Sequence, residues 1–407
     1  MNTKFFAPLL VLIASVSFLH TNAQTDSSQS FPTYKVGIFA PLYLDSLFSN
    51  NTFKYKQGLP KFVIPSVEFI QGAQIALDSM KMGKQNIEAS IYDSKSYTQN
   101  ISQLINTRKL DSLDLIIGSV KDADYKQLAD FALLKNIPFI SATYPNDGGV
   151  TANPFTVIIN STLKAHCEAI YSYLLQNHGT DQIFLCRKKG AQEDKVAGYF
   201  KSLNEQDGKP LLNIKIINND SLTSDFLRPK LDSNRQSVII GGSLDESFAV
   251  NLAIACYELN TPYHITLIGM PNWDGFASLQ KKDDFKDFPI YFTSPYFNNK
   301  WDDYSKMLNS AYLKKFRIKP SDMAFKGFES VYLFTKLLAK YPNDLISHIN
   351  DRTEKVFCEY NIRPVLLKKE NTTPDYFENK HLYFIKLLNG VTSRAFQDVP
   401  GVTSTKK

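Results

Sequence analysis

The chain has 407 residues, enough for one to three domains, and its 43% hydrophobic and 21% charged residues are typical of a globular protein. The net charge is +6, and no block of basic residues exceeds three, which disfavours a nucleic-acid surface. No Cys-x-x-Cys or His-Glu-x-x-His motif indicates a metal, and no Gly-x-Ser-x-Gly motif or phosphate-binding loop indicates an enzyme.

The first residues have the pattern of a secretory signal peptide. Lys4 supplies the positive charge, residues 5–19 are apolar, and Ala23 provides a small residue at a cleavage site before Gln24. No cysteine follows the apolar run, so a bacterial lipid anchor is not expected. We therefore expect residues 1–23 to be removed and the mature chain to be periplasmic or secreted, without a membrane span.

After a polar lead, residues 34–143 alternate between predicted strands and helices. The strands are expected at 34–40, 88–92, 115–118 and 138–141, and the helices at 65–82, 97–110 and 122–135, with a polar loop at 43–60. The strands at 115–118 and 138–141 are apolar throughout, as in a parallel sheet that is covered on both faces. Short connections favour right-handed crossovers and an α/β fold.

The turn-rich stretch 146–154 interrupts this series, and a second one follows a connecting strand at 155–159. Its strands are expected at 183–186, 212–217, 237–240, 264–268 and 289–292, and its helices at 163–176, 193–204, 222–231, 247–259 and 275–280. Two further helices at 301–316 and 322–341 precede strands at 355–360, 363–368 and 382–388. Asn389-Gly390 predicts a turn that folds the last strand back.

Two small hydroxyl residues mark the ends of the central strands. Ser119 follows the strand at 115–118, and Thr143 follows the strand at 138–141. Ligands of open α/β sheets bind just beyond the carboxyl ends of the strands, so these residues are candidates for one wall of a ligand site. The alternative is that they only cap the helices that follow.

The four cysteines, Cys167, Cys186, Cys256 and Cys358, each lie in an apolar segment. Export would permit disulfides, but scattered cysteines in apolar segments are typical of buried free thiols.

Several motifs resemble those of the type I periplasmic solute-binding proteins of the branched-chain amino-acid-binding kind. In order they are Tyr34-Lys-Val-Gly-Ile-Phe-Ala-Pro-Leu, Phe69-Ile-Gln-Gly-Ala-Gln-Ile-Ala-Leu, Ile117-Gly-Ser, Ile137-Pro-Phe-Ile-Ser-Ala-Thr, Ile239-Ile-Gly-Gly and Gly327-Phe-Glu-Ser-Val-Tyr-Leu. The resemblance covers residues 34–345. It implies two α/β lobes, joined by three crossing strands, that close around a ligand. Lobe one would comprise 34–155 and 294–341, and lobe two 156–293 and 342–398.

The resemblance also implies a ligand site between the lobes. In such proteins hydroxyls and backbone amides hold a ligand carboxylate, which Ser119 and Thr143 could do, and an acid with an aromatic from lobe two holds the ammonium group. The matching loops here contain Ser243, Asn272 and Trp273, and Lys189 stands in a third loop. These residues depart from an amino-acid pocket and leave the ligand class open. Tyr43 and Tyr296 are further candidates to line the site, whereas Trp273 could equally serve packing and Lys189 the solvated surface.

The leading hypothesis is an exported solute-binding protein similar to the substrate-binding proteins of amino-acid ABC transporters, serving a transporter or a sensor. The alternative is a degenerate member of the same fold that acts as an envelope protein-interaction or regulatory module. The departures in the pocket and the long loop at 43–60 motivate this alternative. No cofactor or metal is expected.

Overall fold

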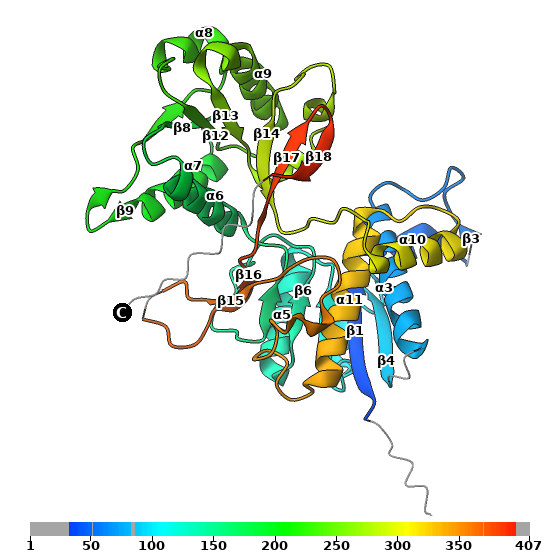
Figure 1. Cartoon of the computed structure of the whole chain (residues 1–407). Coiled ribbons are helices and arrows are strands. Elements are labelled where there is room, and N and C mark those ends of the chain that lie inside the picture. The colour runs from blue at the N-terminus through cyan, green and yellow to red at the C-terminus, as the bar shows by residue number, and fades with distance from the viewer. Residues whose placement is uncertain (1–31, 51, 83–85, 369, 396–407) are drawn as a thin grey trace, which may run out of the picture. The chain divides into compact units, whose positions relative to one another are not determined.

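The computed structural model describes residues 32–50, 52–82, 86–368 and 370–395 (Figure 1). The predicted signal peptide at 1–23 lies outside these ranges. The helices are α2 (Leu44–Leu47), α3 (Ile64–Met82), α4 (Ile101–Asn106), α5 (Asp122–Lys135), α6 (Leu163–Asn177), α7 (Ala191–Asn204), α8 (Ser224–Leu227), α9 (Glu246–Tyr263), α10 (Asp303–Phe316) and α11 (Asp322–Lys340). Among the described residues, every helix is too short or too polar to cross a membrane.

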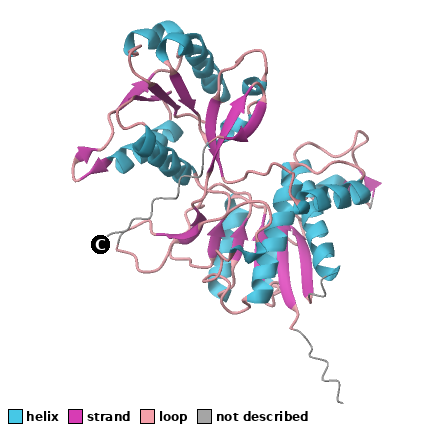
Figure 2. Cartoon of the chain, viewed as in Figure 1, coloured by secondary structure: helices cyan, strands magenta, loops and turns pink. Residues whose placement is uncertain are grey.

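The first sheet has seven strands in the order β15-β16-β7-β6-β5-β1-β4. Strands are drawn in magenta in Figure 2. Their bounds are β1 (Tyr34–Ala40), β4 (Ile87–Asp93), β5 (Leu115–Gly118), β6 (Phe139–Ser141), β7 (Thr156–Ile158), β15 (Ile362–Val365) and β16 (Tyr376–Asn379). All pairs are parallel except β15–β16. Their carboxyl ends therefore meet at one edge, except that of β15.

Successive residues of the central strands point to opposite faces, and both faces are covered. Ile38 packs in a cluster with Phe69 of α3 and Phe328 of α11. The next residue, Phe39, packs in a separate cluster with Leu128 of α5. The predicted apolar strands are therefore buried between two layers of helices, as expected.

The second sheet also has seven strands, in the order β11-β8-β12-β13-β14-β17-β18. Their bounds are β8 (Gln182–Arg187), β11 (Ile214–Asn218), β12 (Ser237–Gly241), β13 (Ile265–Ile268), β14 (Ile290–Ser294), β17 (Tyr383–Leu388) and β18 (Val391–Arg394). The first five strands are parallel, and β17 and β18 run antiparallel to their neighbours. The turn predicted at Asn389-Gly390 joins the last two strands. The predicted α/β fold with two mostly parallel sheets is confirmed.

The strand pairing differs from the predicted lobe boundaries in two segments. β7, β15 and β16 pair in the first sheet, although 156–293 and 342–398 were assigned to lobe two. β16 was not predicted, because its polar residues suggest an exposed segment although they are buried. The Glu378 carboxylate accepts the Thr162 N–H and pairs with Lys380 at 2.6 Å. Because these partners satisfy the charge, a strand that looks like a surface segment is buried.

The strand predicted at 355–360 does not form. This segment follows the 3-10 helix η4 (Arg352–Glu354) as irregular chain. The N–H groups of Phe357 and Cys358 donate to the Glu329 carboxylate of α11, at 3.0 and 2.6 Å, instead of to a neighbouring strand. The buried Glu329 carboxylate thus takes the place of the backbone acceptors that a neighbouring strand would supply.

All four cysteines are buried free thiols, which confirms that prediction. Burial raises the pKa of Cys186 to about 12 and that of Cys167 still further, which makes both thiols unreactive. We expect almost no labelling of the native protein by a thiol reagent, and four labels per chain after denaturation without reductant. Mass spectrometry of the labelled chain checks this, and two labels or none after denaturation would contradict it.

Candidate functional site

Three hydroxyl side chains gather at the carboxyl edge of the first sheet. The Ser119 and Thr143 hydroxyls, which follow β5 and β6, are 3.0 Å apart and hydrogen-bonded. Tyr296 donates its phenol hydrogen to the carbonyl of Ala142, beside Thr143, at 2.6 Å. Burial raises the pKa of Tyr296 well above its usual range, so this phenol stays protonated and can donate. The structure therefore brings together three of the residues predicted for the site.

Asn160 and Lys326 belong to the same edge and were missed from the sequence. Asn160, which follows β7, donates from its amide to the Thr143 carbonyl at 2.6 Å. The ammonium of Lys326, on α11, lies 4.2 Å from the centre of the Tyr296 ring. Burial lowers the pKa of Lys326, while Asp274 and Asp322 oppose that shift. Lys326 could be found from the sequence only by knowing which face of α11 lies beside the strand ends.

Asp274 lies in the second-sheet loop after β13, and its charge opposes the lowering of the Lys326 pKa. Desolvation by the surrounding protein raises the pKa of Asp274, and the positive charge of Lys326 opposes this. Each of these two charges therefore favours the charged form of the other.

The second-sheet candidates are mostly occupied by internal contacts. The buried Ser243 hydroxyl, after β12, donates to the Glu193 carboxylate of α7 at 2.7 Å. The amide of Asn272 donates to the Leu244 carbonyl at 2.8 Å, and its buried Oδ1 has no hydrogen-bond partner among the described residues. Both side chains therefore brace the loops of this edge.

Trp273 is 0% exposed, which corrects its prediction as a ligand-contacting face. Its indole N–H donates to the Ser243 carbonyl at 3.0 Å, and its ring fills the space above Gly241 and Gly269. A Cβ on either glycine would overlap the ring, so these glycines make room for it. The packing alternative therefore holds for Trp273.

Lys189 and Tyr43 lie at exposed or half-buried positions. The Lys189 side chain is exposed, and its N–H donates to Asp220 at 2.9 Å, whereas the neighbouring Lys188 pairs with Asp245 at 3.0 Å. Tyr43 precedes α2 with a φ of 55°, and its ring stacks edge-on against Phe62. Among the described residues, neither forms a hydrogen bond with Ser119, Thr143 or Tyr296, so their role in the site stays a prediction.

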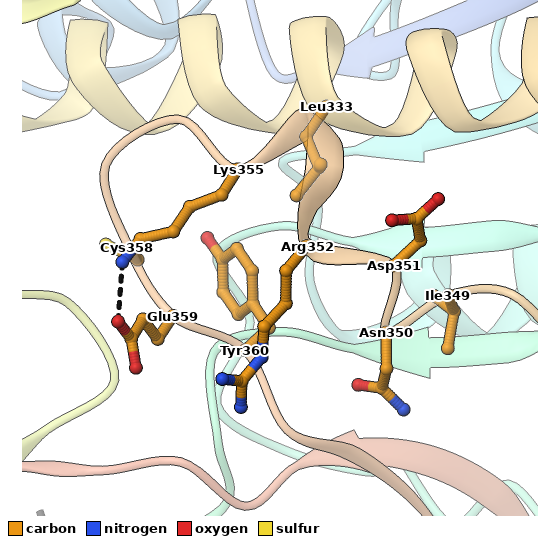
Figure 3. Close-up of a pocket in the computed structure, with 9 residues that line it drawn as sticks. All are labelled: Leu333, Ile349, Asn350, Asp351, Arg352, Lys355, Cys358, Glu359 and Tyr360. Carbon is orange, nitrogen blue, oxygen red and sulfur yellow. Dashed lines mark hydrogen bonds and ion pairs between the residues drawn. The ribbon is translucent and has the colours of Figure 1, made fainter.

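A small cavity lies elsewhere, between α11 and the segment 349–360 (Figure 3). Its volume of about 20 Å³ is room for about one water molecule. The Lys355 ammonium and the Glu359 carboxylate on its lining form an ion pair at 2.6 Å. None of the predicted site residues lines this cavity. Within the described ranges, no cluster of three or more His, Cys, Asp or Glu side chains could hold a metal ion.

Two mostly parallel sheets flanked by helices, with polar groups at the strand ends, define a two-lobe α/β binding-protein fold. The family model described as periplasmic binding protein matches residues 64–349, so the chain belongs to the periplasmic binding protein family. No curated protein matches the sequence.

Solved structures share the fold at low identity. The branched-chain amino acid transporter substrate binding protein LivJ from Streptococcus pneumoniae, in complex with isoleucine, is 15% identical with a TM-score of 0.53, covering 90% of this chain and 99% of that one. A branched-chain amino acid ABC transporter periplasmic ligand-binding protein from Burkholderia xenovorans is 13% identical with a TM-score of 0.55, covering 87% and 90%. An ABC transporter substrate-binding protein from Desulfitobacterium hafniense, in complex with leucine, is 12% identical with a TM-score of 0.55, covering 89% and 100%.

Proposed function

We propose that this chain is an exported solute-binding protein that closes two lobes around a small amino acid and delivers it to an ABC transporter. The observation that carries the proposal is the hydrogen-bonded pair of Ser119 and Thr143 hydroxyls at the strand ends. This is the position at which open α/β sheets bind ligands. The periplasmic binding protein family and the amino-acid ligands named for two similar structures support the same class of solute.

The chemistry of the surrounding groups suits a zwitterion. One hydroxyl hydrogen of the pair is used between Ser119 and Thr143, which leaves one hydroxyl hydrogen free to donate to a carboxylate. Lys326 adds a positive charge beside that edge. Asp274, in the loop after β13, carries the carboxylate that would pair with the ammonium group of the solute.

Removing both hydroxyls in Ser119→Ala/Thr143→Ala should weaken amino-acid binding at least tenfold. A hydrogen bond to a charged group contributes about 1.5–3 kcal/mol, and about 1.4 kcal/mol is already a factor of ten. Isothermal titration with leucine, isoleucine and a panel of other amino acids measures this. The matched control, Ser202→Ala/Thr180→Ala, removes two hydroxyls from exposed positions and should leave the affinity unchanged. Equal affinity in both double variants would contradict the site assignment.

A companion variant tests the ammonium partner. Asp274→Asn should weaken the binding of an amino acid at least tenfold, because a buried ammonium group loses its charged partner. It should leave the binding of the matching carboxylic acid without an amino group unchanged. The same loss for both compounds would contradict the role of Asp274 and leave that of the hydroxyls standing.

A further inference from the structure

Residues 48–50 and 52–62, here called the aromatic–lysine loop, project from the first sheet and its helices around β3 (Thr52–Phe53) (Figure 1). The base of this loop is held firmly. The Asp93 carboxylate, at the end of β4, accepts the N–H groups of Leu42, Tyr43 and Leu44 at 2.8–3.1 Å. The Asp45 carboxylate accepts the N–H of Tyr97 at 2.6 Å. The loop is therefore a built feature with a fixed base.

The outer part of the loop exposes an unusual amount of apolar surface. Phe48 is 43% exposed, Tyr55 41%, Leu59 44% and Phe62 56%. The rings form a row in which Phe53 lies 5.5 Å from Phe48 and 5.8 Å from Tyr55, centre to centre. The rings of Phe48, Phe53 and Tyr55 pack against one another and that of Phe62 packs against Tyr43, while part of each exposed side chain stays in water. Clustered exposed apolar side chains of this kind mark interaction surfaces.

The charges of the loop are all positive. Lys54, Lys56 and Lys61 are exposed, and none forms an ion pair with another described residue. The sequence has no Asp or Glu between Asp45 and Glu68. A surface that carries negative charge and accepts aromatic rings would complement this loop.

We propose that the aromatic–lysine loop binds an anionic lipid surface, with its rings at the headgroup level and its lysines on the lipid phosphates. Aromatic side chains are favoured at membrane–water interfaces, and clustered lysines are attracted to anionic lipids. The cations favour lipid over a protein partner, because protein interfaces are enriched in arginine and depleted in lysine. The proposal is independent of the solute bound by the protein.

Co-sedimentation of the mature chain with vesicles tests the proposal. We expect binding to vesicles of phosphatidylglycerol and phosphatidylethanolamine, no binding to phosphatidylcholine vesicles, and loss of binding at about 0.5 M salt, which screens surface charge. Both Lys54→Gln/Lys56→Gln/Lys61→Gln and Phe48→Ser/Phe62→Ser should reduce the partition coefficient at least tenfold. Circular dichroism verifies that each variant is folded.

The matched control is Lys281→Gln/Lys282→Gln/Lys286→Gln, which changes the net charge equally at three exposed lysines of another segment. It should bind the anionic vesicles like the unchanged chain. An equal loss in this control would show that total charge alone governs binding and would overturn the proposal. Failure of the unchanged chain to bind anionic vesicles would also overturn it and would favour a protein as the occupant of the loop.

Discussion

Replacing Gly327 by alanine is expected to lower the free energy of unfolding by about 3 kcal/mol, the upper range for overpacking a core. Gly327 on α11 faces Phe69 of α3, and Gly72 on α3 faces Ala324 of α11. A Cβ on either glycine would overlap a backbone carbonyl oxygen of the other helix. Because backbone cannot rotate away as a side chain can, the two helices would have to separate. Gly72→Ala should therefore destabilise by a similar amount.

The control for this prediction is Gly198→Ala in α7, where no described atom beyond the adjoining residues and the local helix backbone lies within 4 Å of an added Cβ. Here alanine should stabilise by about 0.5–1 kcal/mol, because it favours helix more than glycine does. Urea unfolding of the three variants measures the effects. If Gly327→Ala were as stable as Gly198→Ala, the close crossing of α3 and α11 would be contradicted.

Replacing Glu329 by alanine is expected to lower the free energy of unfolding by about 3 kcal/mol or more, because it leaves several buried hydrogen-bond donors without an acceptor. Glu329 is 1% exposed, and its carboxylate accepts from the N–H groups of Phe357 and Cys358 and from the Tyr360 hydroxyl at 3.0 Å. These bonds fix the segment that leads to β15. Glu258→Ala, at an exposed position on α9, is the control and should change the stability by less than about 0.5 kcal/mol. Denaturant unfolding compares the two.

Glu329 also predicts a pH dependence. Burial raises the pKa of Glu329, and the donated hydrogen bonds from Cys358, Phe357 and Tyr360 oppose the shift. The folded state thus binds this proton more tightly than the unfolded state, so its contribution to stability falls as the pH rises above about 4.3, the usual glutamate value. As the pH rises from about 4 through the raised pKa, Glu329→Gln should therefore become more stable relative to the unchanged chain. A difference that does not vary with pH would contradict the buried charge.

The order of helices and strands was predictable, because the spacing of apolar residues along the sequence reflects which side chains are buried. The strand at Tyr34–Ala40 and the helix at Asp122–Lys135 form at their predicted bounds, since apolar strands and amphipathic helices need no distant partner to be recognised. β16 could not be predicted, because its Glu378 and Asn379 are buried through partners far away in the sequence. The strand predicted at 355–360 does not form for a related reason, because its N–H groups donate to the distant Glu329 carboxylate of α11.

The candidate site was predictable only in part. The strand-end rule identified Ser119 and Thr143, because parallel strands bring their carboxyl ends to one edge. It could not tell that Trp273 is buried, which depends on the space left by Gly241 and Gly269. Nor could it find Lys326, which reaches the edge from a helix on another part of the chain.

Native mass spectrometry of the protein purified from its own host tests the central proposal, solute binding, most directly. We predict one bound small molecule per chain, with the mass of an amino acid, released on denaturation and absent from Ser119→Ala/Thr143→Ala. The bare mass of the chain, together with no thermal shift from any amino acid in a broad panel, would contradict the proposal.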